Sequence, residues 1–172
     1  MSFLRWLLGL LKRAEPSVRV DVPITHSQED LWRSRQSQYV GTIKLESCVA
    51  RRSYVIVHHS LTKDGNAVNW EAIKRYHIDV NKWSDIGYHF GIERVNNEYV
   101  VLPGRPLDVS GAHTKDGGFN LTSVGVCVVG NYDLEPPPEH AWWTAIFFVR
   151  RVCRYFDIPV HNVIGHWEAQ AT

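Results

Sequence analysis

The chain has 172 residues, of which 44% are hydrophobic and 22% charged, a composition that suits one globular domain with a short extension. Its formal net charge is +1 and it shows no basic stripe, so we expect no nucleic-acid partner. Three cysteines, an odd number without a CxxC pair, argue against a disulfide framework. Cys127 and Cys153 fall in apolar patterns and are predicted to be buried as small hydrophobic residues.

The first predicted element is an amphipathic helix over residues 1–15. Its apolar run is far shorter than the ~20 residues that a membrane-spanning helix needs. It lacks a basic leader and a small-residue cleavage site, so we identify no clear signal peptide. The helix either contacts a membrane surface or packs on the domain or a partner, because its basic residues share one narrow face: Arg5, Lys12 and Arg13. Residues 16–52 have weak periodicity and are predicted to be an arm or linker, with a short helix capped at Ser27.

The patterns sharpen at residue 53, and we assign 53–172 to one domain. Short apolar and β-branched runs predict five strands, at 53–60, 86–95, 98–103, 122–131 and 162–166. The second and third strands are separated by two asparagines, which favours a hairpin. Helical spacing predicts one helix over 68–79 and a long one between the prolines at 136–138 and Pro159. Strands interleaved with helices indicate an α/β layer fold with a central sheet.

Two histidines stand at the ends of apolar strands, His58 after YVIV and His166 after NVIG. Strand ends open onto the rim of a sheet, where α/β proteins place their sites. Imidazole is a common zinc ligand, and a catalytic zinc takes three protein ligands and leaves one position for water. Spacing alone nevertheless favours two structural histidines over a metal site, because nine histidines in 172 residues produce such pairs by chance.

Four sequence segments, in this order, are more specific: VIVHHS, DIGYHFGIE, GAHTKDGGFNLTSVGVCVVGNYD and VIGHWE. Together they resemble the type-2 N-acetylmuramoyl-L-alanine amidase family, which includes phage lysozyme-type amidases and animal peptidoglycan recognition proteins. The resemblance covers the chain from Tyr54 to its end, about two-thirds of its length. It implies a mixed β-sheet flanked by helices, with a zinc ion in a surface groove.

The resemblance also implies roles for five residues. His58 and His166 match the family's histidine ligands to zinc. Tyr88 matches the tyrosine near the metal, where its phenol would orient water or donate to the oxyanion; the alternative is a half-buried strand aromatic. His113 and Asn120 match a loop beside the groove and are predicted to bind substrate, although a structural histidine and a loop-ordering asparagine are the alternatives.

Two neighbouring histidines are predicted to play no part in the metal site. Side chains alternate along a strand, so His59 is expected to face away from His58. The same argument is expected to turn His89 away from the face that carries Tyr88.

The chain departs from the family at its end. The family's third zinc ligand is a Cys or Asp several residues past the second histidine, whereas no Cys, Asp or His follows Glu168 here. Glu168 itself does not stand at the family's position. We expect a fragment or shortened chain rather than a degenerate relative, because every earlier motif is intact. A chain of this length is expected to bind zinc weakly and to hydrolyse poorly.

The implied function is zinc-dependent hydrolysis of the amide between N-acetylmuramic acid and L-alanine in peptidoglycan. The alternative is a module that binds peptidoglycan without cutting it: the retained His58 and Tyr88 favour the enzyme, and the missing ligand favours the binding module. A third interpretation makes the N-terminal helix a tether to a membrane or assembly. We expect a monomer that acts at the cell wall or periplasm, and the sequence indicates no export route.

Overall fold

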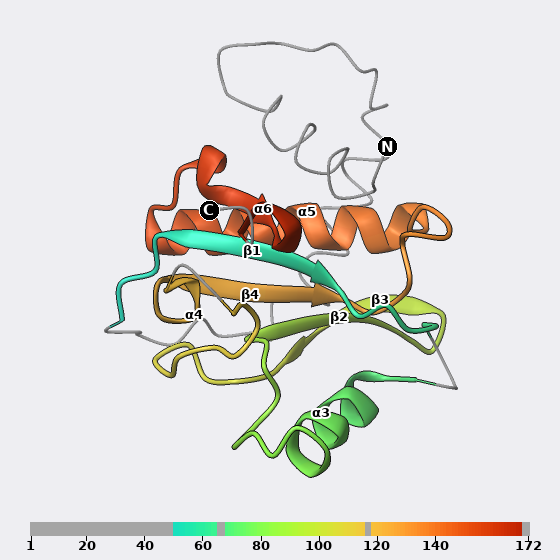
Figure 1. Cartoon of the computed structure of the whole chain (residues 1–172). Coiled ribbons are helices and arrows are strands. Elements are labelled where there is room, and N and C mark those ends of the chain that lie inside the picture. Colours follow the sequence, from blue (N-terminus) through green and yellow to red (C-terminus); the bar gives the residue numbers. More distant parts are fainter. Residues whose placement is uncertain (1–49, 65–67, 116–117, 170–172) are drawn as a thin grey trace, which may run out of the picture.

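Five strands form one mixed sheet in the computed structural model, which describes residues 50–64, 68–115 and 118–169 (Figure 1). The sheet has the order β3-β2-β4-β1-β5, and its strands are β1 Tyr54–His59, β2 Phe90–Val95, β3 Glu98–Pro103, β4 Ser123–Val128 and β5 Val163–Gly165. β2 and β3 are antiparallel, whereas β4 runs parallel to β2 and β1, and β1 parallel to β5. The predicted α/β fold with a mixed central sheet is confirmed.

The hairpin between β2 and β3 turns on Asn96 and Asn97, as the sequence predicts. Their φ angles are 50° and 66°, and two-residue hairpin turns of this kind need positive φ at both positions. Asparagine tolerates the left-handed region better than most residues. The turn therefore sets the register in which Val95 pairs with Glu98.

Two longer helices flank the sheet. α3 (Trp70–Asp79) begins where the Asn69 side chain accepts a hydrogen bond from the Ala72 N–H, at 2.8 Å. α5 (Glu139–Phe156) begins after three prolines and ends where Asp157 adopts a φ of 55°. Three short elements complete the described chain: α4 Phe119–Thr122, the 3-10 helix η1 Val160–Asn162, and α6 His166–Ala169.

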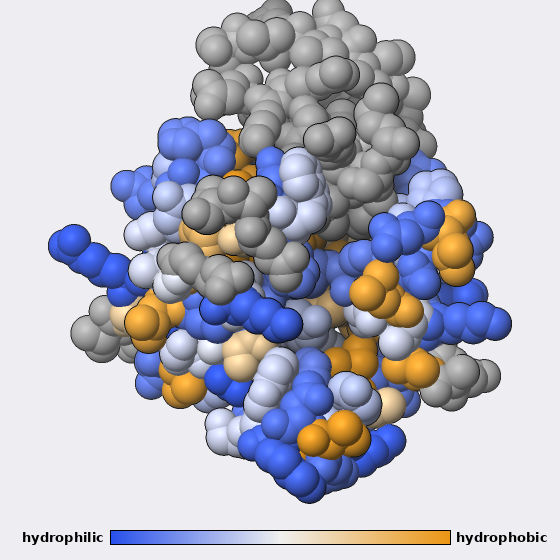
Figure 2. Space-filling view, viewed as in Figure 1, coloured by the Kyte–Doolittle hydropathy of each residue, from blue (hydrophilic) through white to orange (hydrophobic). Residues whose placement is uncertain are grey.

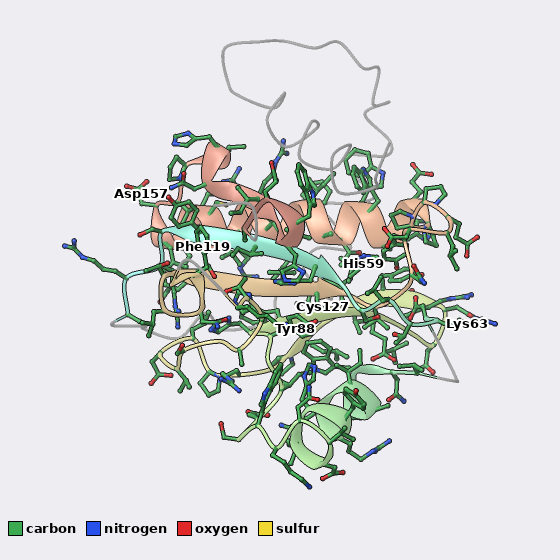
Figure 3. The ribbon with its side chains drawn as sticks, in the orientation of Figure 1. His59, Lys63, Tyr88, Phe119, Cys127 and Asp157 are labelled. Atoms are coloured by element: carbon green, nitrogen blue, oxygen red, sulfur yellow. The ribbon has the colours of Figure 1, made fainter. Side chains whose placement is uncertain are left out.

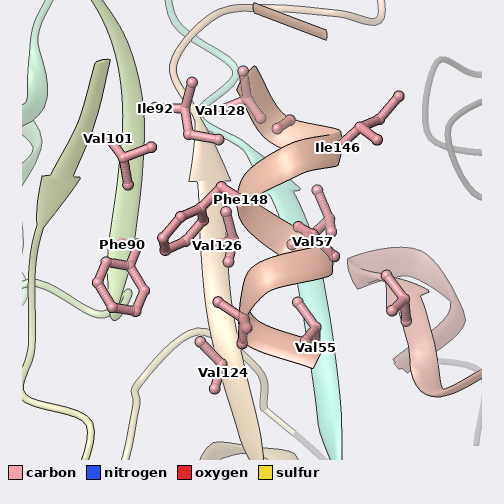
Figure 4. Packing of buried hydrophobic residues seen from close by; sticks show 14 of the residues in the cluster. Val55, Val57, Phe90, Ile92, Val101, Val124, Val126, Val128, Ile146 and Phe148 are labelled. Atoms are coloured by element: carbon pink, nitrogen blue, oxygen red, sulfur yellow. The ribbon is translucent and has the colours of Figure 1, made fainter. Parts of the chain in front are cut away.

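The main hydrophobic core lies between the sheet and α5 (Figure 4). Alternate residues of the strands point into it, including Val55 and Val57 of β1. α5 contributes Phe148, whose ring meets that of Phe90 edge-on with 4.7 Å between centroids. Most side chains on this face are apolar, and we call it the α5 face.

The opposite face of the sheet, which we call the α3 face, carries a smaller cluster of buried side chains: Trp70, Ile73, Ile86, Cys127 and Val129. The Trp70 ring lies directly over Gly91 of β2, where an added Cβ would come within 2.4 Å of it. Its indole N–H donates to the Pro103 carbonyl at 3.0 Å. A glycine on β2 thus lets α3 approach the sheet closely.

The predicted strand over 86–95 was wrong in its first part, since β2 begins only at Phe90. The backbone before it bonds mainly to loop residues: the Gly87 carbonyl accepts from Ala112, and the Tyr88 carbonyl accepts from Arg105. Of this segment, the His89 N–H alone donates to a strand, at the Gly125 carbonyl of β4. The predicted strand ending at His166 also stops one residue earlier, because His166 begins α6.

The predicted N-terminal helix and the arm up to residue 49 lie outside the described residues. Within the part of the chain that is described, no helix is both long and apolar enough to cross a membrane. Figure 2 shows one face of the molecule, on which the coloured apolar residues form separate patches rather than a continuous band.

Candidate active site

Parallel pairing of β1 with β5 brings His58 and His166 side by side. Val57 lies opposite Gly165 in the register, so the residues that follow them, His58 and His166, lie at the same edge of the sheet. The two ring centroids are 4.6 Å apart, with the ring planes inclined by 38°. His58 is 3% exposed and His166 is half-buried. The pairing of these strands therefore brings together two imidazoles that are far apart in the sequence.

Tyr88 joins this pair from the segment before β2. Its ring centroid is 5.1 Å from that of His58, and it stacks on Trp70 at 6.1 Å. Cys127, which pairs with His58 across β1 and β4, lies near the Tyr88 hydroxyl. Figure 3 labels Tyr88 and Cys127 close to each other near the middle of the view. Burial raises the pKa of Tyr88 above its ordinary value, so the phenol keeps its proton at neutral pH.

His113 also comes into the group, but it lies behind His58. Its Nδ1 is 3.1 Å from His58 Nε2, and its Nε2 is 3.4 Å from Ser123 Oγ. The side chain is 7% exposed. The structure thus brings together four of the predicted site residues: His58, Tyr88, His113 and His166.

The fifth predicted residue, Asn120, holds the loop that carries His113. Its Oδ1 accepts from the backbone N–H groups of His113 and Thr114 at 2.8 and 3.0 Å. Its Nδ2 donates to the Thr114 carbonyl. These bonds fix the loop, and substrate contact by Asn120 stays a prediction.

Two buried arginines, neither of them expected from the sequence, support the same loop. Arg52 lies only two residues before β1 and donates to backbone carbonyls of the loop after β3, of α4 and of β4: its acceptors are Leu107, Val109, Asn120, Leu121 and Ser123. Arg105 donates to the carbonyls of Asp85, Ile86 and Ser110. No periodicity marks either residue, because most of their acceptors are backbone carbonyls distant in sequence.

His59 and His89 are engaged elsewhere. His59 faces away from His58 as predicted, and its Nδ1 accepts from the Tyr132 N–H at 3.1 Å. The alternation argument fails for His89, since it precedes β2 and its ring lies 5.7 Å from that of His113. Its Nδ1 accepts from the Gly125 N–H and its Nε2 faces the Val109 carbonyl, so both nitrogens bond to backbone.

The site histidines are held in their neutral form. Burial lowers the pKa of His58 well below its ordinary value, and the neighbouring His113 lowers it further. Burial likewise lowers the pKa of His166, and lowers that of His113 to about 3. A neutral imidazole has a lone pair for a metal ion. The adjacent rings of His58 and His166 are thus a donor set that suits zinc.

A third ligand is not found beside them in the described residues. Within 50–64, 68–115 and 118–169, no three His, Cys, Asp or Glu side chains are grouped so that they could hold a metal ion. Glu168 is occupied differently, because its Oε2 accepts from the Gly165 N–H at 2.8 Å. His58 and His166 would therefore provide two of the three protein ligands of a catalytic zinc.

The architecture is that of peptidoglycan recognition proteins and amidases. Bumblebee PGRP-SA superposes with a TM-score of 0.60 at 29% sequence identity, covering 76% of this chain and 81% of that one. Drosophila PGRP-LB, solved as a mutant in complex with tracheal cytotoxin, also gives 0.60, at 25% identity over 75% of this chain and 78% of that one.

Residues 49–172 match the family described as N-acetylmuramoyl-L-alanine amidase, and the chain belongs to this family. An endolysin of Klebsiella phage KP32 is 42% identical over 87 residues, which are 51% of this chain and 54% of the endolysin. The chain thus spans about half the length of the phage relatives it matches.

Proposed function

We propose that this chain is a zinc-dependent amidase that hydrolyses the bond between N-acetylmuramic acid and L-alanine in peptidoglycan. The observation that carries the proposal is the pair of neutral imidazoles, His58 and His166, 4.6 Å apart at one edge of the sheet, with the Tyr88 ring beside them. Membership of the amidase family supports the reaction.

His58 and His166 would hold the metal ion, and a zinc ion bound there would supply a Lewis acid that polarises the amide carbonyl. Tyr88 remains protonated, so its hydroxyl can donate a hydrogen bond to the oxygen that becomes negative during hydrolysis. Trp70 fixes the tyrosine ring by stacking on it. The loop held by Asn120 and Arg52 would form one side of the site.

The substrate class is supported by relatives of two kinds. Phage endolysins share sequence with this chain, and a structurally similar PGRP-LB was solved with tracheal cytotoxin. We accordingly propose that the protein acts as a monomer on the cell wall.

The test measures two properties of the same protein sample. The 172-residue chain is stripped with a chelator, titrated with zinc, and incubated with purified peptidoglycan while free alanine N-termini are counted. We expect release that depends on zinc. His58→Ala and His166→Ala should each abolish zinc-dependent release, because each removes a nitrogen donor. His161→Ala, at an exposed histidine on η1, is the matched control and should keep it.

Co-sedimentation with peptidoglycan separates the alternatives. Sedimentation without release at saturating zinc would replace the enzyme with a peptidoglycan-binding module. If the chain neither sediments with peptidoglycan nor releases alanine, the proposed substrate is wrong.

A further inference from the structure

We infer that His113 is a positioning residue that fixes the tautomer of His58, so that His58 presents Nδ1 to the metal ion. The inference rests on the proposed function for the metal, but the tautomer itself is a property of the metal-free chain. Two contacts carry the argument: His58 Nε2 to His113 Nδ1, and His113 Nε2 to Ser123 Oγ.

The direction of the hydrogen bonds starts at Ser123. Its hydroxyl donates to the Phe119 carbonyl at 2.6 Å, and a carbonyl can only accept. A serine has a single hydroxyl proton, so its Oγ offers lone pairs to any other partner. That partner is His113 Nε2 at 3.4 Å, which must therefore carry a hydrogen.

The second step passes through the His113 ring. A neutral imidazole has one N–H, so protonation at Nε2 leaves Nδ1 as an acceptor. His58 Nε2, 3.1 Å away, must then donate to it. The remaining nitrogen of His58 is Nδ1, which keeps its lone pair and becomes the ligand atom. Metal-bound histidines commonly donate their other N–H to such an acceptor, which fixes their orientation.

The ring of His113 is locked in place by two glycines. A Cβ added at Gly125 would lie 2.4 Å from His113 Cδ2, and one added at Gly111 would lie 2.5 Å from the same atom. The backbone N–H of His113 is meanwhile held by Asn120. The slot admits an imidazole only because both positions lack a side chain.

This arrangement favours positioning over the predicted contact with substrate. Both nitrogens of His113 already face protein atoms, and little of the side chain reaches the surface. A residue that bound substrate through its ring would have to give up one of these bonds.

The experiment reads the tautomer directly and the metal affinity separately. Long-range ¹H–¹⁵N NMR of the metal-free chain should show His58 protonated at Nε2. The zinc dissociation constant of His113→Phe should rise about 10- to 100-fold, because the phenyl ring fills the slot but accepts no hydrogen bond. His113→Asn, whose amide oxygen can replace Nδ1, should recover part of the affinity. His161→Phe is the matched surface control and should bind zinc like the wild type.

Ser123→Ala tests the chain of hydrogen bonds from Ser123 through His113 to His58 while leaving His113 unchanged. The test therefore does not depend on whether the His113 variants fold. Ser123→Ala should lower the fraction of His58 protonated at Nε2 and weaken zinc binding less than His113→Phe does. Protonation of His58 at Nδ1 in the wild type, or unchanged zinc affinity in a folded His113→Phe, would overturn the inference. A chain that binds no zinc would contradict the proposed function, and the His58 tautomer would still decide the inference.

Discussion

Strand β4 presents different residues to its two faces. Towards α5 it points three valines with no exposed surface: Val124, Val126 and Val128. The residues between them, Gly125 and Cys127, face the opposite side. There, Gly125 leaves room for the His113 ring and Cys127 contacts the Tyr88 hydroxyl. β4 therefore contributes apolar packing residues to the α5 face. To the α3 face it contributes small residues, which leave room for polar side chains.

The difference teaches how the chain separates stability from chemistry. The α5 face buries large apolar side chains, whose removal leaves cavities. The α3 face gathers histidines and a tyrosine that are expensive to bury and so are tied by hydrogen bonds. We expect substitutions on the α5 face to lower stability and substitutions around Tyr88 to lower activity.

Phe148→Ala should give the largest loss of stability. Phe148 is fully buried between α5 and the sheet, and truncation of such a side chain costs about 3–5 kcal/mol. Urea unfolding of the purified chain measures it. Leu134→Ala is the control, since Leu134 is 82% exposed and should change stability by less than about 0.5 kcal/mol. A loss below about 1 kcal/mol for Phe148→Ala would show that the α5 face is not the main source of stability.

Arg52→Met tests whether stability and chemistry are completely separated between the two faces of the sheet. Arg52 supports the site loop but is itself buried, so its loss should cost stability as well, about 2–4 kcal/mol, because several buried carbonyls lose their donor. Arg52→Lys keeps a donor and should cost less. Urea unfolding of both variants checks this order. Equal stability of Arg52→Met and the wild type would mean that water satisfies these carbonyls.

Acid should destabilise the site face through His89, which lies near Arg52, Arg105 and His113. Burial lowers its pKa in the folded chain to about 4, below the ordinary 6.5. As the pH falls from about 6.5 towards 4, the unfolded chain binds a proton that the folded chain does not, so stability falls with pH. At pH 5 this loss is about 2 kcal/mol for His89 alone.

The measurement compares urea unfolding at pH 7 and pH 5, with a chelator present so that metal binding does not contribute. His89→Gln should be less sensitive to pH than the wild type by that amount. The same pH sensitivity in both proteins would show that His89 takes up its proton without penalty.

Much of the fold and the central pair of histidines could be predicted from the sequence. Continuous apolar runs indicated β1, β4 and the long α5. The spacing of His58 and His166 favoured structural histidines, and only the resemblance to the amidase family paired them as zinc ligands. The position of His113 behind His58 could not be predicted, since it depends on a loop closed by contacts distant in sequence. The irregular backbone at 87–89 was hidden for a related reason, because its hydrogen-bond partners are distant in sequence: Ala112 in that loop, Gly104 and Arg105 after β3, and Gly125 on β4.

Tyr88→Phe should have the smallest effect on stability and a large effect on turnover. The substitution removes one oxygen and keeps the ring that stacks on Trp70, so the free energy of unfolding should fall by less than about 1.5 kcal/mol. Turnover should fall about 10²- to 10³-fold if the hydroxyl stabilises the developing oxyanion, while zinc content stays unchanged. Tyr76→Phe, at an exposed tyrosine on α3, is the matched control and should alter neither. Unchanged turnover in Tyr88→Phe would reduce the tyrosine to a packing residue, and the contrast between the two faces would then rest on the histidines alone.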